Sequence, residues 1–195
     1  MHHGSPRRCD LLKKLTPDFE ILVSDFDEDT IKSSENNPIE LVKKLSLAKA
    51  NDIFNKVQYA NNLPFVIIGS DTLVSFKGKI LGKPKDTEDA GHMLFQLQGS
   101  VNTVYTGTTV IIQKNHTLIT VTDYSGSDVY MKNMSENDIW EYINTKEPLD
   151  KAGAYAIQGI GKKYINKFEG DFDSIVGLDV KFIEKVFKKY HIDLL

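Results

Sequence analysis

A carboxylate and a hydroxyl, Asp71 and Thr72, follow a short apolar run at residues 65–68, with Gly69 at the junction. A continuous apolar run bounded by turn residues predicts a strand that is buried on both faces. Polar groups just beyond such a strand lie where ligands collect, so Asp71 is a candidate general base or metal ligand. The alternative is that Asp71 only caps the next turn. These residues alone leave both interpretations open.

The two arginines form the second candidate group. The chain has 22 lysines but only Arg7 and Arg8 as arginines, and they are neighbours. A guanidinium binds phosphate through two parallel hydrogen bonds, which an ammonium cannot do. Ser5 and Pro6 predict a helix start here, where backbone N–H groups also attract anions. The pattern favours an anion site, and a solvated basic turn is the alternative.

An acidic run, Asp25, Asp27, Glu28 and Asp29, follows a predicted strand at residues 19–23. Clustered carboxylates repel one another unless a cation or water separates them. The run is therefore either a metal-binding segment or a solvated loop. Its composition does not distinguish the two.

Two lysines stand in unusual surroundings. A helix predicted from residues 36–38 to about residue 57 has an apolar face that includes Leu45 and Ile53, and Lys49 falls within that face. A lysine there must pair, reach a polar cavity or extend its ammonium to solvent. Lys83 lies between Gly82 and Pro84 at the end of a predicted hairpin.

The elements that must position these residues follow from periodicity and turn signals. The pattern predicts one α/β unit, residues 1–195, with two lobes around a cleft. An irregular segment at 147–161 mixes small and charged residues, and such loops often line sites. The other predicted elements are a hairpin at 74–81, a helix ending at Gly99, a long hairpin at 104–131, a helix after Ser135 with Ile139, Trp140 and Ile143 inward, and a helix at 180–190.

Composition narrows the class of protein. The length of 195 residues, 41% hydrophobic residues and 26% charged residues are typical of one globular domain. A net charge of −3 argues against a nucleic-acid-binding protein with a broad basic face. One cysteine, Cys9, excludes an internal disulfide and suits a reducing compartment. We expect a cytoplasmic protein without a membrane-spanning segment.

Taken in order, these stretches resemble the Maf family of nucleotide pyrophosphatases over essentially the whole chain. The most specific match is the block Glu-Pro-Leu-Asp-Lys-Ala-Gly-Ala-Tyr-Ala-Ile-Gln-Gly at 147–159. The other matching pieces are Ser-Pro-Arg-Arg at 5–8, Asp-Glu at 27–28, Ala-Lys-Ala at 48–50, Gly-Ser-Asp-Thr at 69–72, Leu-Gly-Lys-Pro at 81–84, Tyr-Thr-Gly at 105–107, Gly-Asp at 170–171 and Val-Gly-Leu at 176–178.

The resemblance implies an elongated mixed α/β sheet with flanking helices, shared with inosine-triphosphate pyrophosphatases. It also implies hydrolysis of a nucleoside triphosphate to a monophosphate and pyrophosphate, a divalent cation such as Mg²⁺ or Mn²⁺, and a homodimer. The sequence around Gln158 is similar to the branch that acts on dTTP and UTP. Alternatives are a nucleotide-binding regulator of cell division with little catalysis and a purine (ITP or XTP) pyrophosphatase.

Roles carry over from the family residue by residue. Asp71 matches the proton acceptor, and Glu28 and Asp71 match the metal-binding carboxylates. The remaining matches are phosphate-contacting or catalytic cations (Lys49, Lys83 and Arg8) and positions for substrate binding and selectivity (Ser5, Arg7, Thr72 and Gln158).

Three departures from the family pattern stand out. Only four residues precede Ser5, where the family has a strand, so the resemblance predicts a sheet without its first member. Such a loss would affect the placement of Arg7 and Arg8. Asn102 and Asp179 replace a usual histidine and proline.

Overall fold

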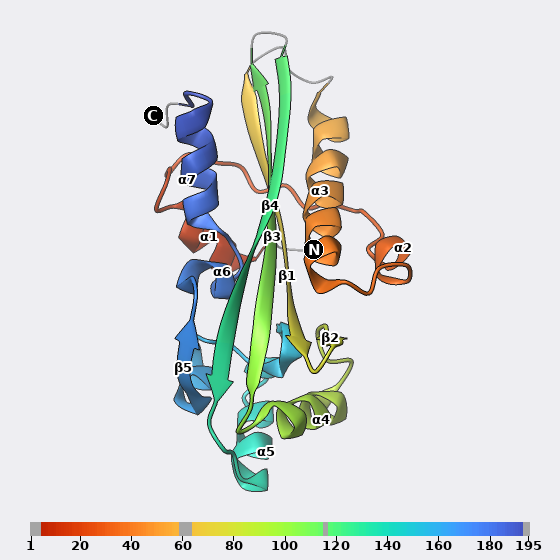
Figure 1. Ribbon diagram of the computed structural model, residues 1–195, viewed down its shortest axis with the longest axis vertical. Coiled ribbons are helices and arrows are strands. Elements are labelled where there is room, and N and C mark those ends of the chain that lie inside the picture. The colour runs from red at the N-terminus through yellow and green to blue at the C-terminus, as the bar shows by residue number, and fades with distance from the viewer. Residues whose placement is uncertain (1–4, 59–63, 115–116, 193–195) are drawn as a thin grey trace. The chain divides into compact units, whose positions relative to one another are not determined.

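The computed structural model describes residues 5–58, 64–114 and 117–192, which form two compact units (Figure 1). Unit 1 comprises Met1–Asp71, Thr106–Ser125 and Gly177–Leu195. Unit 2 comprises Thr72–Tyr105 and Gly126–Val176. The chain therefore passes between the units several times, and three of its strands contribute residues to both.

The described residues contain one five-stranded sheet in the order β2-β1-β3-β4-β5 (Figure 1). The edge strands β2 and β5 pair antiparallel with β1 and β4. The predicted α/β class, with a sheet flanked by helices, is confirmed. The strands are β1 (Phe65–Phe76), β2 (Lys79–Leu81), β3 (Val101–Lys114), β4 (Thr117–Met131) and β5 (Ile165–Glu169).

Unit 1 carries the long helix α3 (Pro38–Val57), which begins as the sequence predicts. The Asn37 side chain accepts hydrogen bonds from the N–H groups of Ile39 and Glu40, which stabilises the helix start. Leu45 and Ile53 are buried on its apolar face. The other helices of unit 1 are α1 (Pro6–Leu12), α2 (Asp29–Lys32) and α7 (Val180–Lys189).

Unit 2 contains most of the short helices. Asp86 caps α4 (Thr87–Leu97), and Ser135 with Asp138 forms a capping box on α5 (Glu136–Asn144). The predicted irregular segment contains three 3-10 turns, of which the first packs against α4 and α5 and the second against α4. These turns are η1 (Glu147–Asp150), η2 (Ala152–Ala154) and η3 (Gly159–Tyr164), and α6 (Phe172–Val176) follows β5.

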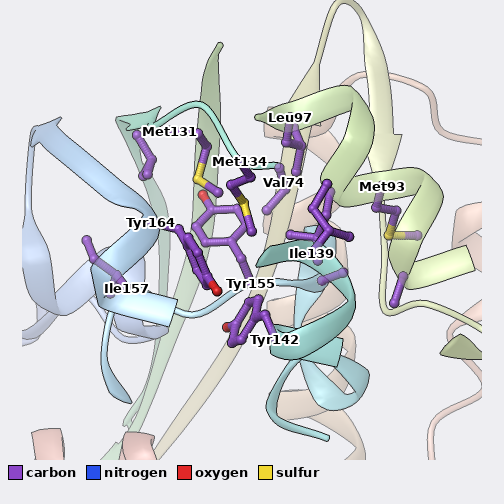
Figure 2. Close-up of a cluster of buried hydrophobic side chains, with 14 of the residues drawn as sticks. Val74, Met93, Leu97, Met131, Met134, Ile139, Tyr142, Tyr155, Ile157 and Tyr164 are labelled. Carbon is purple, nitrogen blue, oxygen red and sulfur yellow. The ribbon is translucent and has the colours of Figure 1, made fainter. Parts of the chain in front are cut away.

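An apolar cluster forms the core of unit 2 (Figure 2). It combines β-branched residues of the sheet with methionines and tyrosines from the helices and turns. The Tyr142 and Tyr164 rings lie 5.3 Å apart between centroids at an interplanar angle of 50°, a tilted geometry that aromatic pairs favour. The labelled members are Val74, Met93, Leu97, Met131, Met134, Ile139, Tyr142, Tyr155, Ile157 and Tyr164.

Several sequence-based expectations were wrong. Residues 19–23 form no strand, and their three apolar residues Ile21, Leu22 and Val23 are exposed, because no neighbouring strand pairs with them. Residues 65–68 are only half-buried, so β1 is not covered on both faces there. Trp140 is 38% exposed, and Tyr142 is the buried aromatic residue of α5 instead.

Other expectations remain predictions. The missing first strand concerns residues 1–4, which lie outside the described residues, as does the turn at Asn115. The assignment of one domain with a cleft between two lobes also stays a prediction. Among the described residues, no helix is both long enough and apolar enough to cross a membrane.

Candidate active site in unit 1

Helix α3 and strand β1 approach each other unusually closely in unit 1. A Cβ atom at Gly69 would lie 2.5 Å from the backbone oxygen of Ser46, so only glycine fits there. Gly107 on β3 allows the same close approach to Val42. Glycine is typical of positions where another backbone comes near a strand. This contact brings the next turn of α3, with Lys49, against the part of β1 that carries Asp71.

Lys49 connects two carboxylates. Its Nζ lies 2.5 Å from Asp71 Oδ1 and 2.6 Å from Glu28 Oε1. The Asp71 side chain is 13% exposed and that of Lys49 is 21% exposed, so the contacts are largely shielded from water. Of the alternatives for Lys49, the structure shows pairing within a polar cluster. Asp71 lies within a continuous strand and does not cap a turn.

Glu28 is held by a second lysine that the sequence analysis missed. Lys32 Nζ lies 2.5 Å from Glu28 Oε2. Burial by itself would raise the pKa of Glu28, but the hydrogen bonds from Lys32 and Lys49 outweigh burial and lower this pKa to about 2. Burial likewise opposes the charge of Lys32, while its bond to Glu28 raises the Lys32 pKa. The spacing of four residues between Glu28 and Lys32 was the available signal.

Arg8 joins the cluster from α1. Burial lowers the pKa of this guanidinium, and the charge of Arg7 adds to that effect. The negative charges of Asp71 and Glu28 act in the opposite direction. An arginine nevertheless stays protonated in a protein, so Arg8 is a fixed positive charge near both carboxylates.

A backbone carbonyl fixes the orientation of Arg8. The Nε of Arg8 donates a hydrogen bond to the backbone oxygen of Gly177 at 2.8 Å. The buried hydroxyl of Ser70 lies 2.8 Å from the same oxygen. Ser70 precedes Asp71 on β1. This strand therefore carries Asp71 and also contacts, through Ser70, the Gly177 oxygen that orients Arg8. Neither Ser70 nor Gly177 was predicted as a site residue, since this long-range contact has no local sequence signal.

Ser5 and Arg7 precede Arg8 at the start of α1. Ser5 is the N-cap residue, but its side chain makes no capping hydrogen bond, and its backbone oxygen accepts from Cys9 N–H. Arg7 is half-buried. The predicted helix start is confirmed, whereas the substrate-binding roles of Ser5 and Arg7 stay predictions.

The acidic run divides between the site and the surface. Only Glu28 of this run contacts Lys49 among the described ion pairs. Asp25 pairs with Lys56, 2.9 Å away, and Asp27 accepts a hydrogen bond from Asp29 N–H. The other three carboxylates of the run are therefore exposed on the segment that leads into α2, whereas Glu28 enters the charged cluster.

The remaining candidates lie in unit 2. Thr72 is the first residue of that unit and is half-buried. Lys83 and Gln158 are exposed on the β2–α4 loop and before η3, respectively. The backbone oxygen of Gly82 accepts from Gly153 N–H at 3.0 Å, which ties the Lys83 loop to the irregular segment. The roles of Thr72, Lys83 and Gln158 stay predictions.

Two carboxylates of unit 1, Glu28 and Asp71, are suited to bind a cation that a ligand also binds. No group of three or more His, Cys, Asp or Glu side chains that could hold a metal occurs in the described part of the chain. Glu28 and Asp71 do, however, share one cation already, the ammonium of Lys49. Mg²⁺ is commonly held by one or two carboxylates together with substrate phosphates and water. The two carboxylates therefore fit such an ion as partial ligands.

The unit 1 cluster is suited to a polyanion. It combines four cations (Arg7, Arg8, Lys32 and Lys49) with two carboxylates (Glu28 and Asp71). The excess of positive charge favours a ligand that brings several negative charges. A carboxylate beside such a ligand can accept a proton from water, and the cations can neutralise charge on phosphoryl oxygens.

Comparison with known proteins identifies a family and several relatives that this chain is similar to. A family model described as Maf-like protein matches residues 3–190. A dTTP/UTP pyrophosphatase of Caldicellulosiruptor bescii is 42% identical over 98% of this chain and 94% of its own length. Proteins of the same name from Clostridium novyi and Bacillus cereus are 40% and 38% identical, each over 98% of this chain and 96% or 94% of its own.

Proposed function

The chain belongs to the Maf family, and from that premise we propose that it hydrolyses dTTP and UTP to the nucleoside monophosphate and pyrophosphate. The relatives with this name match nearly the whole chain. The observation that carries the proposal is the Glu28–Lys49–Asp71 cluster with Arg8 beside it. It supplies both the positive charge and the base that hydrolysis of a phosphoanhydride requires.

Arg8 and Lys49 serve as phosphate-binding cations. The guanidinium of Arg8 is oriented through Nε by the Gly177 carbonyl, and a guanidinium fork suits a phosphate because it can donate two parallel hydrogen bonds. Lys49 contacts two carboxylates, and phosphate oxygens compete for the same ammonium protons. We propose that the triphosphate takes over part of these hydrogen bonds. Lys83 contributes a further cation, as the family resemblance implies.

Asp71 acts as the general base. When the triphosphate engages Lys49, Asp71 Oδ1 becomes available to a water molecule. The water oxygen then forms a bond to the attacked phosphorus while one of its protons moves to Asp71. The bond between that phosphorus and the oxygen that bridges the α- and β-phosphates breaks, and the bridging oxygen leaves with the other phosphate group. A positioned base of this kind contributes about 10²–10⁴ in rate.

A divalent cation, Mg²⁺ or Mn²⁺, is part of the proposal. Glu28 and Asp71 would hold it together with phosphate oxygens, and it would neutralise charge that develops on those oxygens. Glu28 is ionised far below neutral pH, so it is a ready ligand for such an ion. We also propose, from the family resemblance, that two copies of the chain form a homodimer.

Gln158 recognises the base. Its side-chain amide carries both a donor and an acceptor, which complement the N3–H and a carbonyl oxygen of a uracil or thymine ring. The cytosine ring presents an acceptor at N3 and an amino group at C4 instead, which the amide meets only with its oxygen and nitrogen exchanged, so we propose that Gln158 is held in the orientation that suits uracil and thymine. Gln158 is exposed in unit 2 and is therefore accessible to a ligand. Arg7 and Thr72 are proposed to assist in selectivity.

A nucleotide panel tests the proposal. UTP, dTTP, CTP, ITP and XTP are incubated with the protein and Mg²⁺ or Mn²⁺, and nucleoside monophosphate and pyrophosphate are quantified. We expect turnover of UTP and dTTP above that of the other nucleotides, with one pyrophosphate per monophosphate. Turnover of ITP or XTP instead would favour the purine alternative. Tight binding of UTP by calorimetry with no product would favour a non-catalytic regulator.

A further inference from the structure

Gln158 stands between two anchored neighbours in unit 2. Ile157, just before it, is only 7% exposed and belongs to the apolar cluster. Gly159, just after it, has a φ of +68°, a left-handed conformation that glycine adopts at little cost. Gln158 itself is exposed. The buried Ile157 side chain therefore holds the backbone before Gln158, and the Gln158 side chain is presented outward.

One carboxylate holds the chain that follows Gln158. Glu147 Oε1 accepts a hydrogen bond from Ile160 N–H at 3.1 Å, and Glu147 Oε2 accepts one from Gly161 N–H at 2.8 Å. Successive N–H groups after a left-handed residue form a concave anion-binding nest. Here the anion is a side chain of the same unit. A carboxylate with two such bonds is well oriented, because its charge strengthens both of them.

The fit around this carboxylate is close. A Cβ atom at Gly159 would lie 2.1 Å from Glu147 Oε1, and a Cβ atom at Gly161 would lie 2.3 Å from the Tyr142 hydroxyl oxygen. The loop therefore depends on glycine at both positions in order to close on Glu147 and Tyr142.

The buried hydroxyl of Tyr142 completes the arrangement. It bonds to Glu147, and its oxygen accepts from Ala156 N–H at 3.1 Å. Glu147 and Tyr142 together tie both ends of the segment 156–161, which carries Gln158.

We propose that Glu147 is a positioning residue for base selection: it sets the conformation of the Gln158 loop and thereby the preference for uracil and thymine over cytosine. This inference rests on the proposed function, in which Gln158 reads the base. Glu147 contacts backbone N–H groups and Tyr142 and acts on the substrate only through Gln158. Its loss should therefore change selectivity in the same direction as loss of Gln158.

The test compares Glu147→Gln with a matched control, Glu141→Gln. Glu141 lies on α5 of the same unit and bonds only to the exposed Asn137 side chain among the described contacts. The replacement amide at position 147 can accept one N–H but sets its own N–H₂ against the other. For each variant, kcat/KM is measured for UTP and CTP, and hydrogen exchange is followed at residues 159–161.

We expect Glu147→Gln to lower the UTP-to-CTP ratio of kcat/KM about tenfold, the effect of one disrupted hydrogen-bonded anchor. Amides 160 and 161 should exchange faster, and Glu141→Gln should match the wild type in both measurements. In a Gln158→Ala background, Glu147→Gln should produce no further change in the ratio.

Three results would overturn the proposal. They are an unchanged UTP-to-CTP ratio despite faster exchange, equal losses for both substrates, and an additive effect on top of Gln158→Ala. If the wild type turned over neither UTP nor dTTP, the proposed function would fail. The exchange data would still decide separately whether Glu147 holds the loop.

Discussion

Strand β1 contributes to both units, but the helices packed against it meet it with different side chains. In unit 1, α3 approaches at Gly69 and places Lys49 against Asp71. In unit 2, Val74 and Phe76 of the same strand join a cluster of aliphatic, methionine and tyrosine side chains. A charged contact and an apolar core thus lie within a few residues of each other along one strand.

The two regions should contribute differently to the free energy of unfolding. When charged groups are partly buried, the free energy that they lose through desolvation is about as large as the free energy that they gain from mutual attraction. The Glu28–Lys49–Asp71 cluster therefore adds little net stability. Apolar side chains in the unit 2 cluster gain about 25 cal/mol for each Å² removed from water. We infer that the apolar cluster of unit 2 stabilises the protein, whereas the charged cluster of unit 1 serves a ligand. Substitutions in each cluster test this inference.

Among the substitutions that compare the two regions, Lys49→Met should have the largest effect on activity. It removes the cation that Glu28 and Asp71 share and that we assign to phosphate binding. We expect UTP turnover to fall about 10²–10³-fold, the usual effect of removing a preorganised charge. The free energy of unfolding should fall by about 1–2 kcal/mol, because Glu28 and Asp71 lose their shared cation while Lys32 and Arg8 still offset their charge. Steady-state kinetics and chemical denaturation measure the two quantities.

Lys44→Met is the matched control on the same helix. Lys44 pairs with Glu35 at the surface, so its loss should leave both quantities close to wild type. Equal effects of the two lysine substitutions on turnover would contradict a special role for Lys49.

Leu94→Ala should give the opposite pattern. Leu94 lies on α4 and is 0% exposed, so truncation leaves a cavity in unit 2. We expect a loss of about 3 kcal/mol in the free energy of unfolding. The remaining folded protein should keep most of its kcat at low temperature. Phe95→Ala, at a neighbouring position that is 43% exposed, should cost clearly less.

Tyr155→Phe tests a polar contact inside the same core. The Tyr155 hydroxyl donates to Asn102 Oδ1 at 2.7 Å, and both residues are buried. Its removal leaves the Asn102 oxygen without that donor, so we expect a loss of about 1–2 kcal/mol in unfolding free energy. The ratio of UTP to CTP turnover should not change. A shift in that ratio would place Asn102 and Tyr155 in substrate recognition.

The smallest effect concerns acid stability. The folded-state pKa of Glu28 is about 2, below its ordinary value of 4.5. Ionised Glu28 therefore contributes stability above pH 4.5, and this contribution is lost as the pH falls toward about 2. Relative to Glu28→Gln, which cannot titrate, the wild type should lose stability across that window. Parallel curves of unfolding free energy against pH would contradict the assignment.

Local signals predicted much of the fold. The helix starts at residues 36–38 and after Ser135, the hairpin at 74–81 and the apolar face of α3 all follow from nearby residues, and the structure confirms them. Residues 19–23 alternate like a strand, but a strand requires a partner, and sequence cannot show that one is missing. Periodicity placed Trp140 inward, but its side chain is 38% exposed, and Tyr142 is the buried aromatic residue of α5.

The candidate site could likewise be predicted in part from nearby residues. Lys49 and Asp71 were identified because each stood in chemically unusual surroundings, and the structure brings them together. The contacts of Arg8 and Ser70 with the Gly177 carbonyl join residues far apart in the chain, so no local pattern could indicate them. Glu147 was matched only as part of a long motif, and its two bonds to backbone N–H groups became visible only in three dimensions.

The most direct test of the account is UTP turnover and binding by Asp71→Asn. The substitution keeps the size of the side chain and removes its ability to accept a proton. We expect pyrophosphate release to fall about 10²–10⁴-fold, while calorimetry shows UTP binding and denaturation shows near-wild-type stability. A variant that releases pyrophosphate at close to the wild-type rate would contradict the assignment of Asp71 as the base.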